Sequence, residues 1–143
     1  MDKFQEHLAN YQANVKKDME KRLAFIREQV DGSGMAGVVV GISGGIDSSV
    51  TAALCVKALG TERVIGVWMP AYSQPVHEAD AKKLAETIGL NLVTVDVGPA
   101  YDTLVSALEK VLPLGDKTKG NTKARLRMAT LYAIANQKGC LVA

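Results

Sequence analysis

The fold of this 143-residue chain is decided by residues 38–48, which read VVVGISGGIDS. Residues 38–42 are a short, continuous apolar run, and such a run predicts a strand that is buried on both faces of a sheet. Gly44 and Gly45 then predict a turn, because a residue without a Cβ atom can adopt positive φ and approach a ligand closely. Residues 49–59 predict a helix. A buried strand, a glycine turn and a helix are therefore expected in direct succession.

Outward from this stretch, apolar runs and amphipathic segments alternate toward the C-terminus. We expect strands at residues 64–69, 90–97 and 140–143, helices at 78–88, 101–112 and 121–138, and a polar loop at 113–120. Asn121 is the expected N-cap of the last helix. Strands that alternate with helices indicate right-handed crossovers and a parallel sheet covered by helices on both faces. The expected fold is therefore α/β, with three α/β/α layers and a mostly parallel, doubly wound sheet.

A long helix is expected before this core. Apolar residues recur at three- and four-residue intervals from Phe4 to Val30, which is one stripe of an amphipathic helix. A helix of about 27 residues is long for a domain of this size. Two shorter helices that meet near Asn10 or Asn14 are an alternative, because asparagine has a weak helix propensity. An apolar stripe of this length also predicts contact with a second subunit, and hence a homodimer.

Length and composition are typical of one domain, with this helix at residues 1–34 and a Rossmann-like core at 35–143. The chain has 17 Lys and Arg residues against 15 Asp and Glu residues, and the net charge of +2 disfavours nucleic-acid binding. Cys55 and Cys140 are too few for a disulfide framework or a metal cage. No apolar run approaches the roughly 20 residues that cross a bilayer, and the N-terminus is unlike a signal peptide. We expect a cytoplasmic protein without a membrane segment.

The glycine turn carries the chemistry that we expect. Successive N–H groups around Gly44 and Gly45 can form an anion-binding nest, and the following helix adds the positive end of its dipole. Ser43 and Ser48 offer hydroxyl groups beside this nest. Such a cradle suits phosphate or pyrophosphate. The turn has no lysine and is not a Walker A loop, and it also lacks the Gly-x-Gly-x-x-Gly pattern of dinucleotide-binding folds.

Asp47 is the unexpected member of the turn. A carboxylate beside bound phosphates would repel them at a low effective dielectric constant. A divalent cation between the two removes this repulsion, and Mg²⁺ is commonly held by one or two carboxylates together with phosphate oxygens. The alternative is that Asp47 caps the helix, as aspartate often does. The neighbouring glycines and serines favour phosphate and Mg²⁺.

Two segments resemble a known family. Residues 43–48, SGGIDS, resemble the Ser-Gly-Gly-x-Asp-Ser pyrophosphate loop of the N-type ATP pyrophosphatases, which cleave ATP between the α- and β-phosphates. Residues 120–128, GNTKARLRM, are similar to the Gly-Asn-x-Lys-Ala-Arg-x-Arg-Met stretch of NAD synthetases within that superfamily. The resemblance covers residues 37–143 and implies an adenine nucleotide alpha hydrolase-like fold. Other amidating or thiolating synthetases of the superfamily share the first loop and are an alternative.

The resemblance implies a set of binding residues. The ATP and pyrophosphate site would comprise Gly41, Ile42, Ser43, Gly44, Gly45, Ile46, Asp47 and Ser48, with Asp47 as the Mg²⁺ ligand. Arg125 would bind deamido-NAD, since a planar guanidinium group can bind a carboxylate or phosphate through two parallel hydrogen bonds. Lys123 and Arg127 are expected to be solvated surface charges. Trp68 and Met69 are expected either to line an adenine pocket or to belong to the core.

The resemblance also implies a reaction. The nicotinate carboxylate of deamido-NAD would attack the α-phosphorus of ATP, and ammonia would then convert the adenylate to NAD. No segment is typical of a glutaminase, so we expect ammonia to be supplied directly or by a separate protein. The chain ends inside an expected strand, and the family's remaining ATP contacts and second Mg²⁺ carboxylate are expected beyond Ala143. We therefore expect a fragment that binds ATP weakly and turns over poorly, with a non-catalytic nucleotide-binding module as the more distant alternative.

Overall fold

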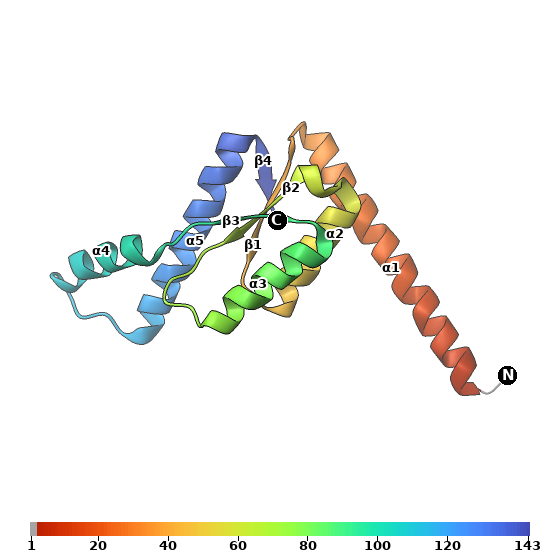
Figure 1. The fold of residues 1–143 in the computed structure, drawn as a ribbon, viewed down its shortest axis with the longest axis horizontal. Helices are drawn as coiled ribbons and strands as arrows, with labels where there is room; N and C mark the ends of the chain where they lie inside the picture. Colours follow the sequence, from red (N-terminus) through yellow and green to blue (C-terminus); the bar gives the residue numbers. More distant parts are fainter. Residues whose placement is uncertain (1–2) are drawn as a thin grey trace.

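The computed structural model describes residues 3–143 as a four-stranded parallel sheet with helices on both faces (Figure 1). The strands are β1 (Gly37–Ile42), β2 (Val64–Trp68), β3 (Asn91–Thr94) and β4 (Cys140–Val142), in the spatial order β3-β2-β1-β4. Neighbouring strands are all parallel, and Val39 of β1 pairs with Ile65 of β2 and Val142 of β4. The expected three-layer, doubly wound α/β fold is confirmed.

The helical segments are α1 (Lys3–Ser33), α2 (Ile46–Leu59), the short 3-10 turn η1 (Thr61–Arg63), α3 (Pro75–Ile88), α4 (Gly98–Glu109) and α5 (Asp116–Lys138). α5 departs most from its expected boundaries, because it begins at Asp116 and Asn121 lies inside it rather than at its N-cap. Gly115 is the N-cap residue in an extended conformation. The Asp116 carboxylate then lies in the first turn, where the helix dipole favours a negative charge. The expected polar loop is correspondingly shorter.

β1 is the centre of the core because both of its faces are covered. Val38, Val40 and Ile42 are buried in one apolar cluster with residues of α2 and α3. Val39 is buried in a second cluster on the opposite face, which also contains Ala135 of α5. Full burial of a valine or isoleucine side chain contributes roughly 1.5–3 kcal/mol. This burial on two sides explains why the strand is a continuous apolar run.

α1 is one continuous helix of 31 residues, so the alternative of two helices that meet near Asn10 or Asn14 is wrong. Its C-terminal part packs on the domain through Leu23 and Val30, which are both buried. Arg27 adds a tie to α2, since its Nε donates a hydrogen bond of 2.8 Å to a backbone carbonyl oxygen there. Although α1 is long, no helix of residues 3–143 is apolar enough to span a membrane.

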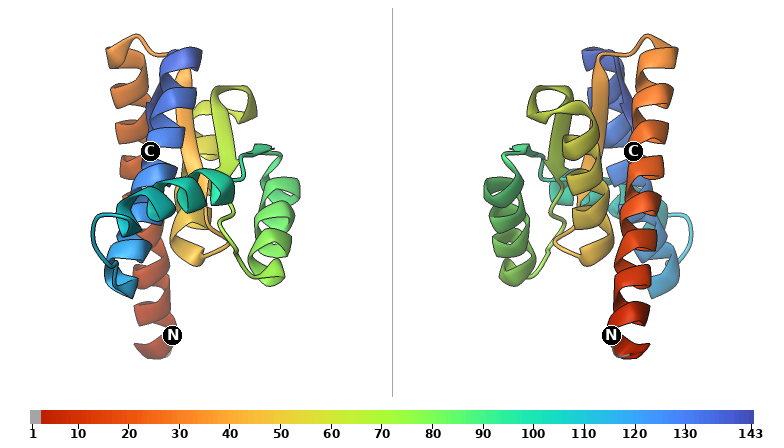
Figure 2. Two further views of the ribbon diagram at one scale, coloured as in Figure 1. Left: turned by 90° about the vertical axis from the view of Figure 1, so that its left-hand side faces the viewer. Right: turned by 90° about the vertical axis from the view of Figure 1, so that its right-hand side faces the viewer.

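The N-terminal part of α1 extends away from the other elements, as Figures 1 and 2 show. Leu8, Tyr11 and Val15 of the apolar stripe are 39%, 64% and 50% exposed. The single stripe that the sequence predicts therefore has two environments, one packed on the domain and one open to contact with another surface.

The connection from β3 to β4 positions the glycine turn. The chain adds β2 and β3 on one side of β1 and then returns through α4 and α5 to place β4 on the other side. The strand order therefore reverses beside β1. In open α/β sheets, ligands bind beyond the carboxyl ends of the strands at such a reversal. Residues 43–45 follow β1 directly and occupy this position.

Candidate functional site

The glycine turn joins β1 to α2 and has a left-handed geometry at its first glycine. Gly44 has a φ of 78°, and a Cβ atom at this position would lie 2.6 Å from the His77 carbonyl oxygen. Both the backbone geometry and the close approach require glycine here. Gly45 is the N-cap residue of α2 in an extended conformation, with a φ of −93°. The expected turn is present, and one of its two glycines carries the unusual geometry.

Two serine hydroxyl groups brace the turn from inside. The Ser43 and Ser48 hydroxyl oxygens lie 3.0 Å apart, and the Ser43 amide donates to Ser48 Oγ at 3.1 Å. The Ser48 hydroxyl donates to the Gly45 carbonyl oxygen at 3.1 Å, and the Gly45 amide donates to Ser43 Oγ at 3.2 Å. The amides of Ile46 and Asp47 lie at the start of α2 and therefore have no intrahelical acceptor. The serines fix the shape of the turn, and these amides are available to an anion.

Asp47 lies in the first turn of α2 and is exposed. α2 has no side-chain cap, so the alternative in which Asp47 caps this helix is wrong. Among residues 3–143, no hydrogen bond or ion pair engages this carboxylate, and no three His, Cys, Asp or Glu side chains gather into a metal site. A carboxylate beside free amides fits a Mg²⁺ ion that takes its other ligands from phosphate and water. The Mg²⁺ role of Asp47 stays a prediction with which its surroundings agree.

A cavity of about 390 Å³ opens beside the turn, lined by Ser43, Trp68, Met69, Arg127, Met128 and Leu131, among others. Ser43 belongs both to the turn and to this cavity. Trp68 and Met69 are buried, so they line the cavity and also belong to the core. Pockets of this size with a largely apolar lining are typical small-molecule sites. The lining suits a planar group such as a nucleobase.

Arg127 borders this cavity, and the prediction that it is a solvated surface charge is wrong. The residue is half-buried, and its Nε donates to the Met69 carbonyl oxygen at 3.0 Å. A guanidinium group has five N–H donors, so others are available to a bound group. The sequence does carry a signal for this position, because Arg127 precedes Leu131 by four residues and therefore shares its helix face. Leu131 packs against the sheet.

Arg125 lies beside a different cavity. It is exposed, and it lines a cavity of about 360 Å³ between α4 and α5 that also contacts Leu104, Leu108, Thr118, Asn121, Thr122 and Leu126. Its Nη1 lies 3.9 Å from the Sδ atom of Met128, which lines the cavity beside the turn. The structure therefore places Arg125 next to the glycine-turn cavity but outside it. Its binding role stays a prediction.

Lys123 is a half-buried member of the same helix rather than a fully solvated charge. Its ammonium group lies 4.8 Å from the centroid of the Tyr101 ring and 5.7 Å from that of the Tyr72 ring. Cation–π contacts at such distances are attractive. Neither ring was expected near the site from the sequence.

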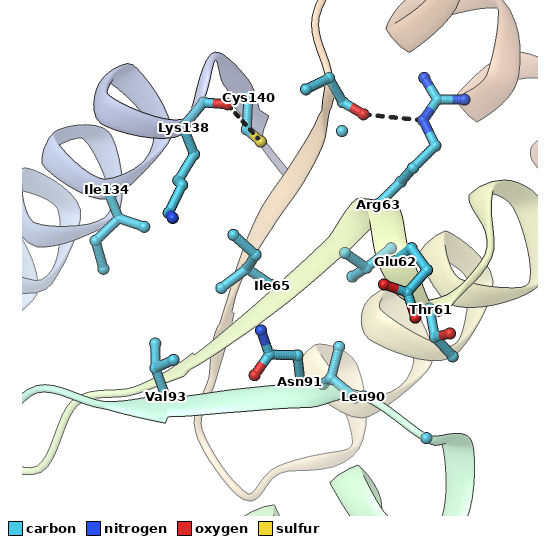
Figure 3. A pocket seen from close by; sticks show the side chains of 14 residues that line it. Thr61, Glu62, Arg63, Ile65, Leu90, Asn91, Val93, Ile134, Lys138 and Cys140 are labelled. Atoms are coloured by element: carbon cyan, nitrogen blue, oxygen red, sulfur yellow. Dashed lines mark hydrogen bonds between the residues drawn. The ribbon is translucent and has the colours of Figure 1, made fainter.

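A larger cavity, of about 700 Å³, lies at the opposite, amino end of the strands (Figure 3). Ile65, Val93 and Ile134 supply apolar walls, and Asn91 and Lys138 supply polar groups. α5 lines this cavity with its C-terminal residues, where the helix dipole disfavours anions. The larger volume therefore does not make this cavity the better candidate for a phosphate site.

Comparison with known proteins points to one family. The sequence profile of the NAD synthase family matches residues 18–143. A relative from Finegoldia magna, an NH(3)-dependent NAD(+) synthetase, is 43% identical over 129 residues, which are 90% of this chain and 52% of the relative. The chain thus spans about half the length of the curated relatives it matches.

Solved structures show the same similarity. An NH3-dependent NAD synthetase from Campylobacter jejuni superimposes with a TM-score of 0.82 at 34% identity, covering 89% of this chain and 54% of that one. An NMN synthetase from Francisella tularensis superimposes with a TM-score of 0.81 at 31% identity, covering 89% and 52%. Both similarities therefore extend over most of this chain and about half of the solved one.

Proposed function

The chain belongs to the NAD synthase family, and on this premise we propose that its glycine turn and the adjoining cavity bind ATP for the amidation of deamido-NAD with ammonia. In this reaction the carboxylate of deamido-NAD attacks the α-phosphorus of ATP, which forms an adenylate and releases pyrophosphate. Ammonia then attacks the activated carbonyl carbon and displaces AMP, so that NAD is formed. The names of the curated relatives support this activity.

The observation that carries the proposal is the position of Ser43, which belongs both to the turn and to the cavity. A nucleobase in the cavity beside Trp68 would have its phosphates close to the amides that begin α2. Such amides stabilise the charge on a departing pyrophosphate without reorganising. Phosphoryl transfer of this kind depends on positioning and charge neutralisation more than on a covalent group from the protein.

Asp47 is the residue that would hold Mg²⁺ in this proposal. Its carboxylate has no competing partner among residues 3–143 and lies in the same turn of α2 as the available amides. When bound, Mg²⁺ supplies neutralisation of the phosphate charge. Without a cation, the same carboxylate would repel the phosphates. We therefore expect the affinity for ATP to depend on Mg²⁺ through Asp47.

The second substrate is proposed to bind along the first half of α5. Residues 110–127 contain six Lys and Arg residues and one Asp residue, a local charge of 6 − 1 = +5 in a chain whose net charge is +2. Such a concentration of positive charge attracts an anionic dinucleotide. Arg125, at the cavity between α4 and α5, is the residue proposed to bind deamido-NAD.

A titration tests the ATP site directly. Trp68 is the only tryptophan and lines the cavity, so its fluorescence reports on an occupant. We expect ATP with Mg²⁺ to change this fluorescence, and Asp47→Asn to weaken the Mg²⁺-dependent affinity by about tenfold to a hundredfold. Asp18→Asn on α1 is the matched control and should titrate like the unmodified chain. Equal ATP affinity with and without Mg²⁺ would favour a plain nucleotide-binding module instead.

A second candidate activity follows from the solved NMN synthetase, whose similarity to this chain is close to that of the NAD synthetase structure. If this chain made NMN by the same amidation, its substrate would be nicotinic acid mononucleotide in place of deamido-NAD. Titration of the ATP-loaded protein with each compound separates the two. Tighter binding of the dinucleotide supports NAD synthesis, and tighter binding of the mononucleotide supports NMN synthesis.

We propose that the protein is cytoplasmic. We also propose that it forms a homodimer through the exposed part of the α1 stripe. Tyr11 and Val15 present apolar surface that the other described residues, 3–143, leave open. Burying such surface against a second copy is favourable at about 25 cal/mol per Å². Sedimentation should show a dimer for the unmodified chain and for Gln12→Asp, and a monomer for the double variant Tyr11→Asp, Val15→Asp. A monomeric unmodified chain would contradict this interface.

A further inference from the structure

Tyr72, in the segment between β2 and α3, has a backbone conformation that is unusual for its residue type. Its φ is 61°, and among residues 3–143 it is the one residue other than glycine with positive φ. This left-handed conformation brings Cβ too close to the backbone and is unfavourable for most side chains. Tyr72 is also 70% exposed, so burial of its ring contributes little in return. Residues that are kept in such conformations cluster at functional sites.

The Tyr72 side chain ties its segment to two helices. Its hydroxyl group donates a hydrogen bond to the carboxylate of Asp102 on α4. This hydrogen bond raises the pKa of Tyr72 above its ordinary value. The Lys123 ammonium group of α5 lies 5.7 Å from the centroid of its ring and 4.8 Å from that of Tyr101. This side chain therefore adds contacts with α4 and α5 to those that the segment makes through its backbone, where the Pro70 carbonyl oxygen accepts a hydrogen bond of 3.0 Å from the Val97 amide.

The segment so held joins the two halves of the nucleotide site. At its beginning Met69 lines the cavity beside the glycine turn, and its carbonyl oxygen accepts the hydrogen bond from Arg127. At its end the first turn of α3 lies against the glycine turn, where the His77 backbone fills the space beside Gly44. A displacement of residues 69–77 would therefore move the cavity beside the turn, where the base is proposed to bind, relative to the glycine turn.

We infer that Tyr72 is a positioning residue for ATP, which sets the distance between the base pocket and the glycine turn by anchoring residues 69–77 to Asp102 and Lys123. The inference rests on the proposed function of that site. Glycine would adopt the same φ without strain. A role in stability alone would therefore be served at least as well by glycine as by alanine, whereas a positioning role needs the tyrosine side chain.

Three substitutions separate these two roles. Tyr72→Gly and Tyr72→Ala both remove the side chain, but only alanine retains the backbone strain, so the thermal midpoint of the glycine variant should be higher by about 3 °C. Both should nevertheless bind ATP about fivefold to tenfold more weakly than the unmodified chain, as measured by Trp68 fluorescence with Mg²⁺ present. Tyr72→Phe, which loses only the hydrogen bond to Asp102, should weaken binding by about threefold. Tyr11→Phe on α1 is the matched control and should leave the ATP affinity unchanged.

Each result has a definite meaning. Weaker binding by Tyr72→Gly together with its higher thermal midpoint relative to Tyr72→Ala supports a positioning role, because the recovered stability then restores no affinity. Unchanged ATP affinity in Tyr72→Gly overturns the inference alone. Affinity that returns in Tyr72→Gly along with stability also overturns it, in favour of a purely structural role. An unmodified chain that does not bind ATP overturns the proposed function and this inference together.

Discussion

The two ends of the parallel sheet differ in a way that volume does not reveal. The amino end has the larger cavity, of about 700 Å³, while the cavity at the carboxyl end measures about 390 Å³. The carboxyl end, however, receives the N-terminus of α2 with its unpaired amides, and the amino end receives the C-terminus of α5. The peptide dipoles therefore favour anions at one end and cations at the other. The direction of the strands and helices, more than the volume of a cavity, is therefore the basis on which we propose a phosphate site.

Gly44→Ala should have the largest effect of the substitutions considered, because it disrupts the proposed anion site at the carboxyl end of the sheet. The substitution places a Cβ atom 2.6 Å from the His77 carbonyl oxygen in a residue whose φ is 78°. The turn must then rearrange, and we expect the ATP affinity to fall by about a hundredfold or more. Gly32→Ala is the control, because a Cβ atom added at Gly32 on α1 would meet no other atom within 4 Å. An ATP titration of both variants checks this, and equal affinities would contradict the role of the turn.

Arg125→Ala should distinguish two proposed binding sites at the carboxyl end of the sheet, one for deamido-NAD and one for ATP. Loss of a guanidinium group that binds an anion through two hydrogen bonds should weaken deamido-NAD binding by about thirtyfold. ATP binding should change little, because Arg125 lies outside the cavity beside the turn. Calorimetric titration with each ligand measures both effects, with Lys117→Ala as a control for the loss of one positive charge on α5. If Arg125→Ala and Lys117→Ala lost the same affinity for deamido-NAD, Arg125 would contribute only its positive charge and no specific contact.

Lys138→Ala should have the smallest effect. Lys138 lines the amino-end cavity, far from the glycine turn along the length of α5. We expect the affinity for ATP to change by less than about twofold, because Lys138 is exposed at the amino end of the strands and the glycine turn follows the carboxyl end of β1. If Lys138→Ala lost as much ATP affinity as Gly44→Ala in the same titration, nucleotide would bind at the amino end of the sheet, which would contradict the proposed site.

Much of the fold could be predicted because its signals are local. The apolar run from Val38 to Ile42 is buried on both faces, and the glycine at position 44 has the positive φ that the turn requires. The start of α5 could not be predicted in the same way. Gly120 lowers helix propensity and suggests a loop, but the helix continues through it from Asp116. Contact with α4, which includes an ion pair of 2.7 Å between Lys119 and Glu109, stabilises the helix there despite the local preference.

Only the part of the candidate site that is formed by the backbone of the strand–turn–helix pattern could be predicted from the sequence. Ser43, Gly44 and Asp47 lie where the strand–turn–helix pattern places them. Tyr72 could not be placed, and Arg127 could be assigned only to a helix face, since their roles depend on contacts with segments distant in sequence. A tyrosine with positive φ has no local sequence signal at all. Such residues become visible only when the elements are assembled.

The most direct test of the central claim is an amide nuclear magnetic resonance titration of the uniformly ¹⁵N-labelled chain with pyrophosphate and Mg²⁺. We predict that the largest amide shifts occur at residues 44–48, which include the free N–H groups at the start of α2. Shifts that are largest at residues 61–63 and 138–140, around the amino-end cavity, with the glycine turn unaffected, would contradict it.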